Sequence, residues 1–139
     1  MKKILKGLFI LLFIILLSAC TKDYKEISYT KFIDTFQEEG YLVNDSYKDD
    51  RYARYIEASG KSSQFIFYEF ESEEEARKYV KEDYSNKKYY TYKDKKDYIT
   101  VKCKKDRYFY LVQIGKTVIV GNTKSNKKEI NRMMKKLGY

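Results

Sequence analysis

The stretch that decides the fold is residues 98–122, with the sequence YITVKCKKDRYFYLVQIGKTVIVGN. Short polar turns divide it into three segments rich in β-branched and aromatic residues: 98–104, 108–114 and 117–122. Tyr108 to Val112 is apolar at successive positions, which is typical of a strand buried on both faces. We therefore predict an antiparallel meander of three strands whose middle strand lies inside the sheet.

A second pair of strands is expected earlier in the chain. Residues 51–59 and 64–70 each divide their side chains between two faces, and the turn residues 60–63 join them. This pattern predicts an antiparallel hairpin. Before the hairpin, residues 41–43 are expected to run extended, and residues 44–50 (NDSYKDD) to form a solvated polar loop rather than a cation site.

Three helices are predicted from apolar side chains spaced three and four residues apart. The first covers residues 28–39, the second residues 72–85, and the third the segment that ends at Gly138. Each begins at a small polar residue that can cap its first turn: Ser28, Ser72, and Ser125 or Asn126. Gly40 and Gly138 suit the left-handed position that ends a helix.

The acidic run Glu73–Glu75 belongs to the start of the second helix. Ser72 followed three residues later by Glu75 is a capping box, and carboxylates suit the positive end of a helix dipole. We interpret the run as a helix start rather than as a metal or acid–base site.

The predicted element order is α-β-β-α-β-β-β-α. Strands linked by hairpins and interrupted by helices indicate an α+β fold. We expect an antiparallel sheet of about five strands with three helices packed mainly on one face.

The first nineteen residues have the layout of a secretory signal peptide. Lysines near the start precede an unbroken apolar run, 7–17, and the small residues Ser18 and Ala19. As a helix, residues 7–19 would span roughly 20 Å at ~1.5 Å per residue. That length is well short of the ~30 Å hydrocarbon core of a bilayer, which favours a cleaved signal over a transmembrane helix.

Leu17-Ser18-Ala19-Cys20 resembles the lipobox of bacterial lipoproteins. The resemblance implies that Cys20 carries a diacylglyceryl group, with or without a further N-acyl chain, and that the precursor is cut just before it. It implies a small membrane lipoprotein of the Gram-positive type, on the outer face of the cell membrane. The expected organisation is a removed signal peptide (1–19), a lipidated cysteine with a short tether (20–27) and one α+β domain (28–139).

Composition argues against most catalytic sites. The sequence contains no histidine, which excludes Ser-His-Asp and Cys-His catalysis and histidine-bound zinc. Cys103 shares a strand face with Ile99 and Val101, which indicates a core position rather than a nucleophile. We predict a non-catalytic protein with no cofactor beyond the lipid on Cys20.

Residues 86–97, NKKYYTYKDKKD, are the strongest candidate binding segment. They lack helical or strand periodicity, so we predict an exposed loop of low order. Alternating aromatic and cationic side chains suit a polyanion or a glycan, although the tyrosines could instead pack back on the sheet. The candidate residues are Lys87, Lys88, Tyr89, Tyr90, Tyr92, Lys93, Lys95 and Lys96.

The expected function is that of a cell-surface binding or interaction module. Loss of residues 1–19 removes three of the 29 basic residues and none of the 20 acidic ones, which leaves a net charge of +6. Candidate partners are the membrane through the lipid anchor, an anionic wall polymer, a glycan or a membrane protein, but no nucleic acid. The alternatives are an accessory subunit of a membrane complex and an enzyme that uses Cys103 or carboxylates.

Overall fold

A computed structural model describes residues 23–45 and 49–139. The signal segment, the lipobox and Cys20 lie outside the described residues, as do residues 46–48 of the polar loop, so the sequence predictions for them stay predictions.

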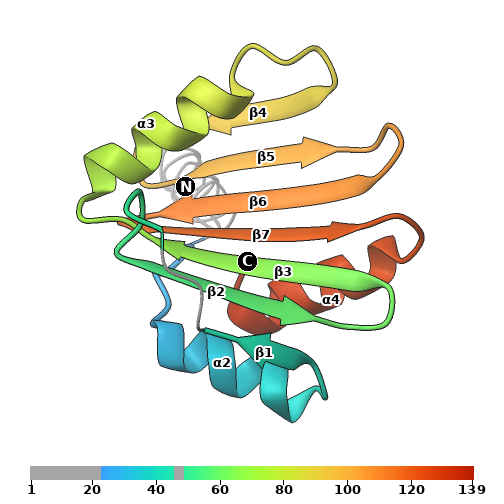
Figure 1. Ribbon diagram of the computed structural model, residues 1–139. Helices are drawn as coiled ribbons and strands as arrows, with labels where there is room; N and C mark the ends of the chain where they lie inside the picture. Colours follow the sequence, from blue (N-terminus) through green and yellow to red (C-terminus); the bar gives the residue numbers. More distant parts are fainter. Residues whose placement is uncertain (1–22, 46–48) are drawn as a thin grey trace, which may run out of the picture.

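The molecule is built on one antiparallel sheet of seven strands in the order β1-β2-β3-β7-β6-β5-β4 (Figure 1). The strands are β1 (Leu42–Asn44), β2 (Arg54–Ser59), β3 (Ser63–Glu69), β4 (Tyr90–Asp94), β5 (Ile99–Cys103), β6 (Tyr108–Ile114) and β7 (Thr117–Thr123). The predicted hairpin is β2–β3 and the predicted meander is β5–β6–β7. The α+β class is therefore confirmed.

Three helices complete the described structure: α2 (Tyr29–Glu38), α3 (Glu73–Tyr84) and α4 (Lys127–Leu137). Each first turn is capped as the sequence predicts. The side-chain oxygens of Ser28, Ser72 and Asn126 each accept a backbone N–H bond at 3.2 Å from the residue three positions later. Asn126, not Ser125, therefore caps α4. Gly40 and Gly138 end their helices with φ of 77° and 101°, values that favour glycine.

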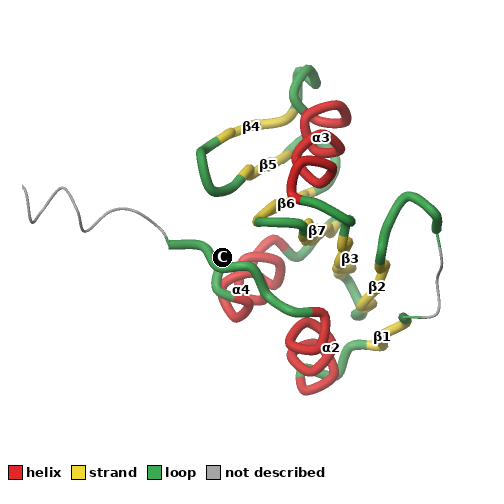
Figure 2. Tube along the Cα trace, turned by 90° about the vertical axis from the view of Figure 1, so that its left-hand side faces the viewer, coloured by secondary structure: helices red, strands yellow, loops and turns green. Residues whose placement is uncertain are grey.

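The helices divide between the two faces of the sheet, and this division creates two cores (Figure 2). Helices α2 and α4 share one face, in line with the prediction, and α3 covers the other. Strand β7 lies between them: Ile119 packs under α2 and α4, whereas Val118 and Val120 pack on the side of α3. The alternation along a strand sends neighbouring residues to opposite faces, so a central strand needs apolar residues at both.

The sheet has more strands than the five predicted, because both of its edges are strands that the sequence did not reveal. Strand β1 forms from the segment expected only to run extended. Strand β4 lies inside residues 86–97, so the prediction of a loop without strand structure is wrong there. Tyr90 and Tyr92 pair with Cys103 and Val101 of β5. An edge strand tolerates lysines on its solvated side. The lysines in and around β4 made its alternation of aromatic and polar residues hard to recognise in the sequence.

The segment before α2 is fixed to the domain from Tyr24 onward. The Tyr24 ring meets Tyr98 edge to face with 4.6 Å between centroids, and it meets Tyr139 at 5.8 Å. The Tyr139 hydroxyl donates to the carbonyl of Lys25 at 3.2 Å, and Ile27 is buried in the core. The part of the predicted tether that lies before Tyr24 is therefore very short.

Candidate anion-binding site

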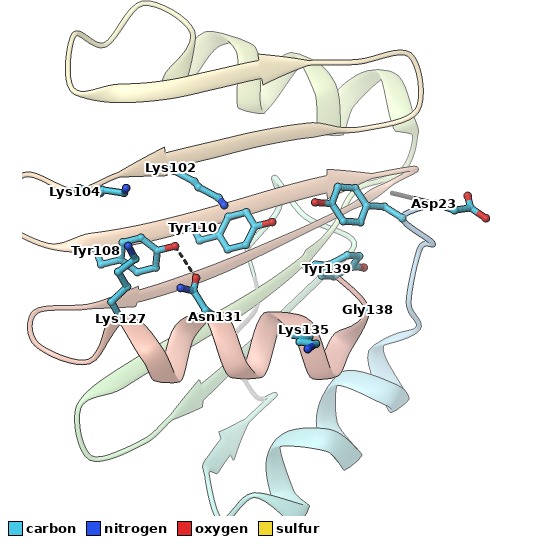
Figure 3. Close-up of a pocket in the computed structure, with 11 residues that line it drawn as sticks. Asp23, Lys102, Lys104, Tyr108, Tyr110, Lys127, Asn131, Lys135, Gly138 and Tyr139 are labelled. Atoms are coloured by element: carbon cyan, nitrogen blue, oxygen red, sulfur yellow. Dashed lines mark hydrogen bonds between the residues drawn. The ribbon is translucent and has the colours of Figure 1, made fainter. Parts of the chain in front are cut away.

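The face that carries α2 and α4 is only partly covered by helix. Helix α2 packs on β1 and β2, and α4 packs on β7, which leaves β4 and β5 open on this side. A hollow of about 680 Å³ lies between β5, β6 and α4 (Figure 3), and a second hollow of about 880 Å³ adjoins it over β4 and β5. Both are lined by Tyr24, Lys102, Lys104 and Tyr110, so they form one continuous depression. We call it the lysine trough.

The floor of the trough is aromatic. Tyr108 and Tyr110 alternate along β6, so both rings point to the side of α4, where they are 8% and 4% exposed. The Tyr108 hydroxyl donates to the Asn131 side-chain oxygen at 2.7 Å, which ties the floor to α4. Burial raises the pKa of Tyr110 far above its usual range, and a hydrogen bond with the Tyr24 side chain adds to the rise. The floor is therefore neutral and rigid.

Lysines lie directly over this floor. The Lys102 Nζ lies 4.1 Å from the centroid of the Tyr110 ring, and the Lys127 Nζ lies 5.3 Å from that of Tyr108. An ammonium group over an aromatic face is held there by the ring quadrupole. The rings thus position two cations from different elements, one on β5 and one on α4, on the same depression (Figure 3).

The charge of the trough is strongly one-sided. Its lining contains two aspartates, Asp23 and Asp97, against seven lysines: Lys93, Lys95, Lys96, Lys102, Lys104, Lys127 and Lys135. Within residues 23–45 and 49–139, no ion pair joins a carboxylate to six of these lysines: Lys93, Lys95, Lys96, Lys104, Lys127 and Lys135. Six lysines that converge without a carboxylate partner among the described residues create a positive potential in a cleft.

Helix α4 shows the contrast between its two polar sides. Arg132 and Lys136 bind the Glu39 carboxylate at 2.8 Å and 2.5 Å, which joins α4 to the end of α2. The Arg132 guanidinium, with help from Lys136, lowers the pKa of Glu39 to about 2. Lys127 and Lys135 instead line the trough. Glu39 and Glu129 neutralise one side of the helix, whereas Lys127 and Lys135 on the other side have no carboxylate partner among the described residues.

The predicted candidate segment is split by the sheet. Lys93, Lys95 and Lys96 line the trough. Tyr90 and Tyr92 turn to the opposite face and pack against the core beneath α3. The remaining three candidates, Lys87, Lys88 and Tyr89, are exposed residues outside the trough lining.

Sequence reasoning missed the trough residues that lie outside residues 86–97. Lys102 and Lys104 alternate with Cys103, and this alternation alone placed them on the face opposite the thiol. Lys127, Asn131 and Lys135 recur every four residues, which marks one stripe of a helix. These two patterns were available in the sequence. Nothing in the sequence showed that the strand lysines and the helix stripe line the same hollow.

The alternative sites lie apart from the trough. Cys103 is half-buried beside Tyr89, Tyr90 and Phe109 in a hollow of about 290 Å³. Asp49 of the polar loop binds Arg51 at 2.6 Å, and hydrogen bonds from Arg51 lower its pKa to about 2. Glu73–Glu75 are exposed in the first turn of α3. Among the described residues, no three metal-binding side chains of the His, Cys, Asp or Glu type come together.

No protein family and no curated protein matches this sequence. In three dimensions the chain is similar to a protein described as a GTP binding regulator from Thermotoga maritima, with a TM-score of 0.56. The likeness covers 80% of this chain and 87% of that one at 11% sequence identity. At this identity the likeness concerns the fold alone. No helix in the described part of the chain is long and apolar enough to cross a membrane.

Proposed function

We propose that this chain is a lipid-anchored module on the outer face of the cell membrane that binds an anionic ligand in the lysine trough, without catalysing a reaction. The signal segment and the lipobox support the location. The convergence of seven lysines from β4, β5, the loops that follow these strands and α4 on a tyrosine floor is the observation that carries the binding function.

The trough suits a ligand with several phosphate or carboxylate groups. Its two joined hollows, of about 680 Å³ and about 880 Å³, accommodate an extended molecule. Every cation in the lining is a lysine, and lysine acts as a point charge without the bidentate geometry of arginine. Recognition therefore depends on charge density rather than on a fixed hydrogen-bond pattern. Anionic wall polymers and phosphorylated glycans have this chemistry.

The test uses inorganic polyphosphate as a probe and the full chain as the protein. In the variant K102Q/K104Q/K127Q, we expect the affinity to fall at least about tenfold and the dependence of affinity on salt to become shallower, because fewer counterions are released on binding. Isothermal titration at several salt concentrations measures both quantities.

The matched control removes the same charge elsewhere. Lys61, Lys87 and Lys88 are exposed and lie outside the trough lining, so K61Q/K87Q/K88Q changes the net charge equally. We expect its affinity to stay within about twofold, since these lysines are outside the lining and salt screens exposed charges that do not contact the probe. An equal loss in both variants would show that only the net charge attracts the probe, and it would refute the trough as a site.

A further inference from the structure

We propose that the anion held in the lysine trough is the headgroup phosphate of an anionic phospholipid in the same membrane that anchors the chain. This inference rests on the proposed function above and names the source of its ligand. Three features of the described structure support it: the position at which the chain enters the domain, the charge difference between the two faces, and the aromatic floor.

The chain enters the domain at the rim of the trough. Asp23 (Figure 3) and Tyr24 belong to the lining. Tyr24 is held there by its contacts with Tyr98 and Tyr139. Only four peptide steps separate Tyr24 from Cys20, and they reach about 14 Å when fully extended. The polar headgroup region on each side of a bilayer is about 5 to 8 Å deep. A lipid on Cys20 therefore keeps the rim of the trough close to the headgroups.

Helices α4 and α3, on opposite faces of the sheet, differ in charge. The difference favours an orientation in which the trough faces the membrane. Helix α4, beside the trough, contains five basic residues and one acidic residue. Helix α3, on the opposite face, contains three basic and five acidic residues. An anionic membrane surface attracts the first helix and repels the second over roughly a Debye length, about 10 Å. The trough therefore turns toward the membrane and α3 turns away from it.

The chemistry of the lining fits a headgroup at the interface. Ammonium groups such as those of Lys102 and Lys104 bind phosphate, and tyrosine rings prefer the boundary between apolar and polar surroundings. Lys102 is held over Tyr110, so its charge is positioned before a lipid arrives. A soluble polymer would need to enter a trough whose rim is already at the bilayer.

The experiment measures how fast each lysine of the anchored protein is acylated by an amine reagent. The lipid-anchored chain is isolated from membranes and reconstituted into vesicles of phosphatidylcholine, with or without phosphatidylglycerol. Mass spectrometry gives the rate for each lysine and the mass of the N-terminal peptide. We expect phosphatidylglycerol to slow acylation of Lys102, Lys104 and Lys127 about fivefold, and to leave Lys87 and Lys88 unchanged.

The other possible outcomes show whether the headgroup inference alone fails or the proposed function fails with it. If phosphatidylglycerol gives no protection but added polyphosphate protects the same lysines on phosphatidylcholine vesicles, the trough binds anions and the lipid source is wrong. If neither protects them, both proposals fail. Equal slowing at Lys87 and Lys88 would indicate general surface attraction and overturn the headgroup site. An N-terminal peptide without lipid on Cys20 would remove the reach argument and refute the inference.

Discussion

The two faces of the sheet around β4, β5 and β6 use the same residue types for different purposes. On the face of α3, Tyr84 stacks on Phe109 at 5.4 Å and meets Tyr90 edge to face at 5.4 Å. On the face of α4, Tyr108 and Tyr110 form a floor with lysines above them. The difference arises from helix coverage. Helix α3 closes its side of these strands, whereas α4 lies to one side and leaves a trough.

The comparison shows why tyrosine content alone says little about a binding site. A ring beneath a helix contributes buried area and packing contacts to folding. Tyr108 and Tyr110 in the trough are buried too, and in addition one face of each ring lies next to a lysine ammonium group. We therefore expect substitutions on the face of α3 to change stability, and substitutions of the trough lysines to change binding.

The largest expected effect is on stability, from Tyr84→Ala. This change removes the ring that joins α3 to Phe109 and Tyr90, and we expect the free energy of unfolding to fall by about 3 kcal/mol. Urea denaturation measures it. Tyr84→Phe is the control, because it keeps the ring and should cost about 1 kcal/mol or less. The folded Tyr84→Ala protein should bind polyphosphate within about twofold of the native chain, and a tenfold loss would show that the faces are coupled.

A smaller effect is expected from alkaline pH, and it involves both faces. Burial raises the pKa of Tyr68 and Tyr84 on the side of α3 and of Tyr110 in the trough. In the unfolded chain these phenols ionise near pH 10. Above about that pH the folded state holds more protons than the unfolded state, so stability is full below it and falls as the pH rises.

Urea unfolding at a series of alkaline pH values tests this expectation. Each buried tyrosine contributes a slope of up to about 1.4 kcal/mol per pH unit. Tyr84→Phe and Tyr110→Phe should each remove part of the slope, which would show that both rings remain neutral in the folded protein. A free energy of unfolding that stays constant from about pH 9 to about pH 11 would contradict the burial of these hydroxyls.

The smallest expected effect is the stability change of K102Q/K104Q/K127Q. Loss of the ring contacts of Lys102 and Lys127 costs about 0.5 kcal/mol each at partly exposed sites. Relief of repulsion among the trough lysines offsets part of that cost. We therefore expect a free energy of unfolding within about 1 kcal/mol of the native value. A loss larger than about 2 kcal/mol, measured by the same denaturation, would mean that these lysines support the fold rather than a ligand.

Sequence patterns predicted most of the interior elements and failed at the edges. The hairpin, the meander and the three helix caps depend on residues close together in the chain, such as Ser72 and Glu75. The two edge strands, β1 and β4, were not predicted as strands. Each pairs with a neighbour on only one side, which weakens its hydrophobic pattern. In β4, Tyr90 and Tyr92 alternate with Thr91 and Lys93, and the neighbouring lysines hid that alternation.

Only part of the candidate site was predicted, because the prediction depended on local composition and not on which face each side chain takes. Lys93, Lys95 and Lys96 were identified through local composition, together with Tyr90 and Tyr92, which the pairing of β4 with β5 turns to the other face. The every-other-residue alternation of a strand separates neighbours that a loop would keep together. Composition therefore found the right segment and only some of the right side chains.

The sequence by itself determined the α+β class, the helix ends and the strand pairing within the hairpin and within the meander, because these depend on short-range spacing and turn chemistry. Only the tertiary structure decided which helix covers which face of the sheet. That choice brings Lys102 of β5 and Lys104 just after it to the same trough as Lys127 and Lys135 of α4. Contacts between distant segments depend on how whole elements pack, and local patterns leave that packing open.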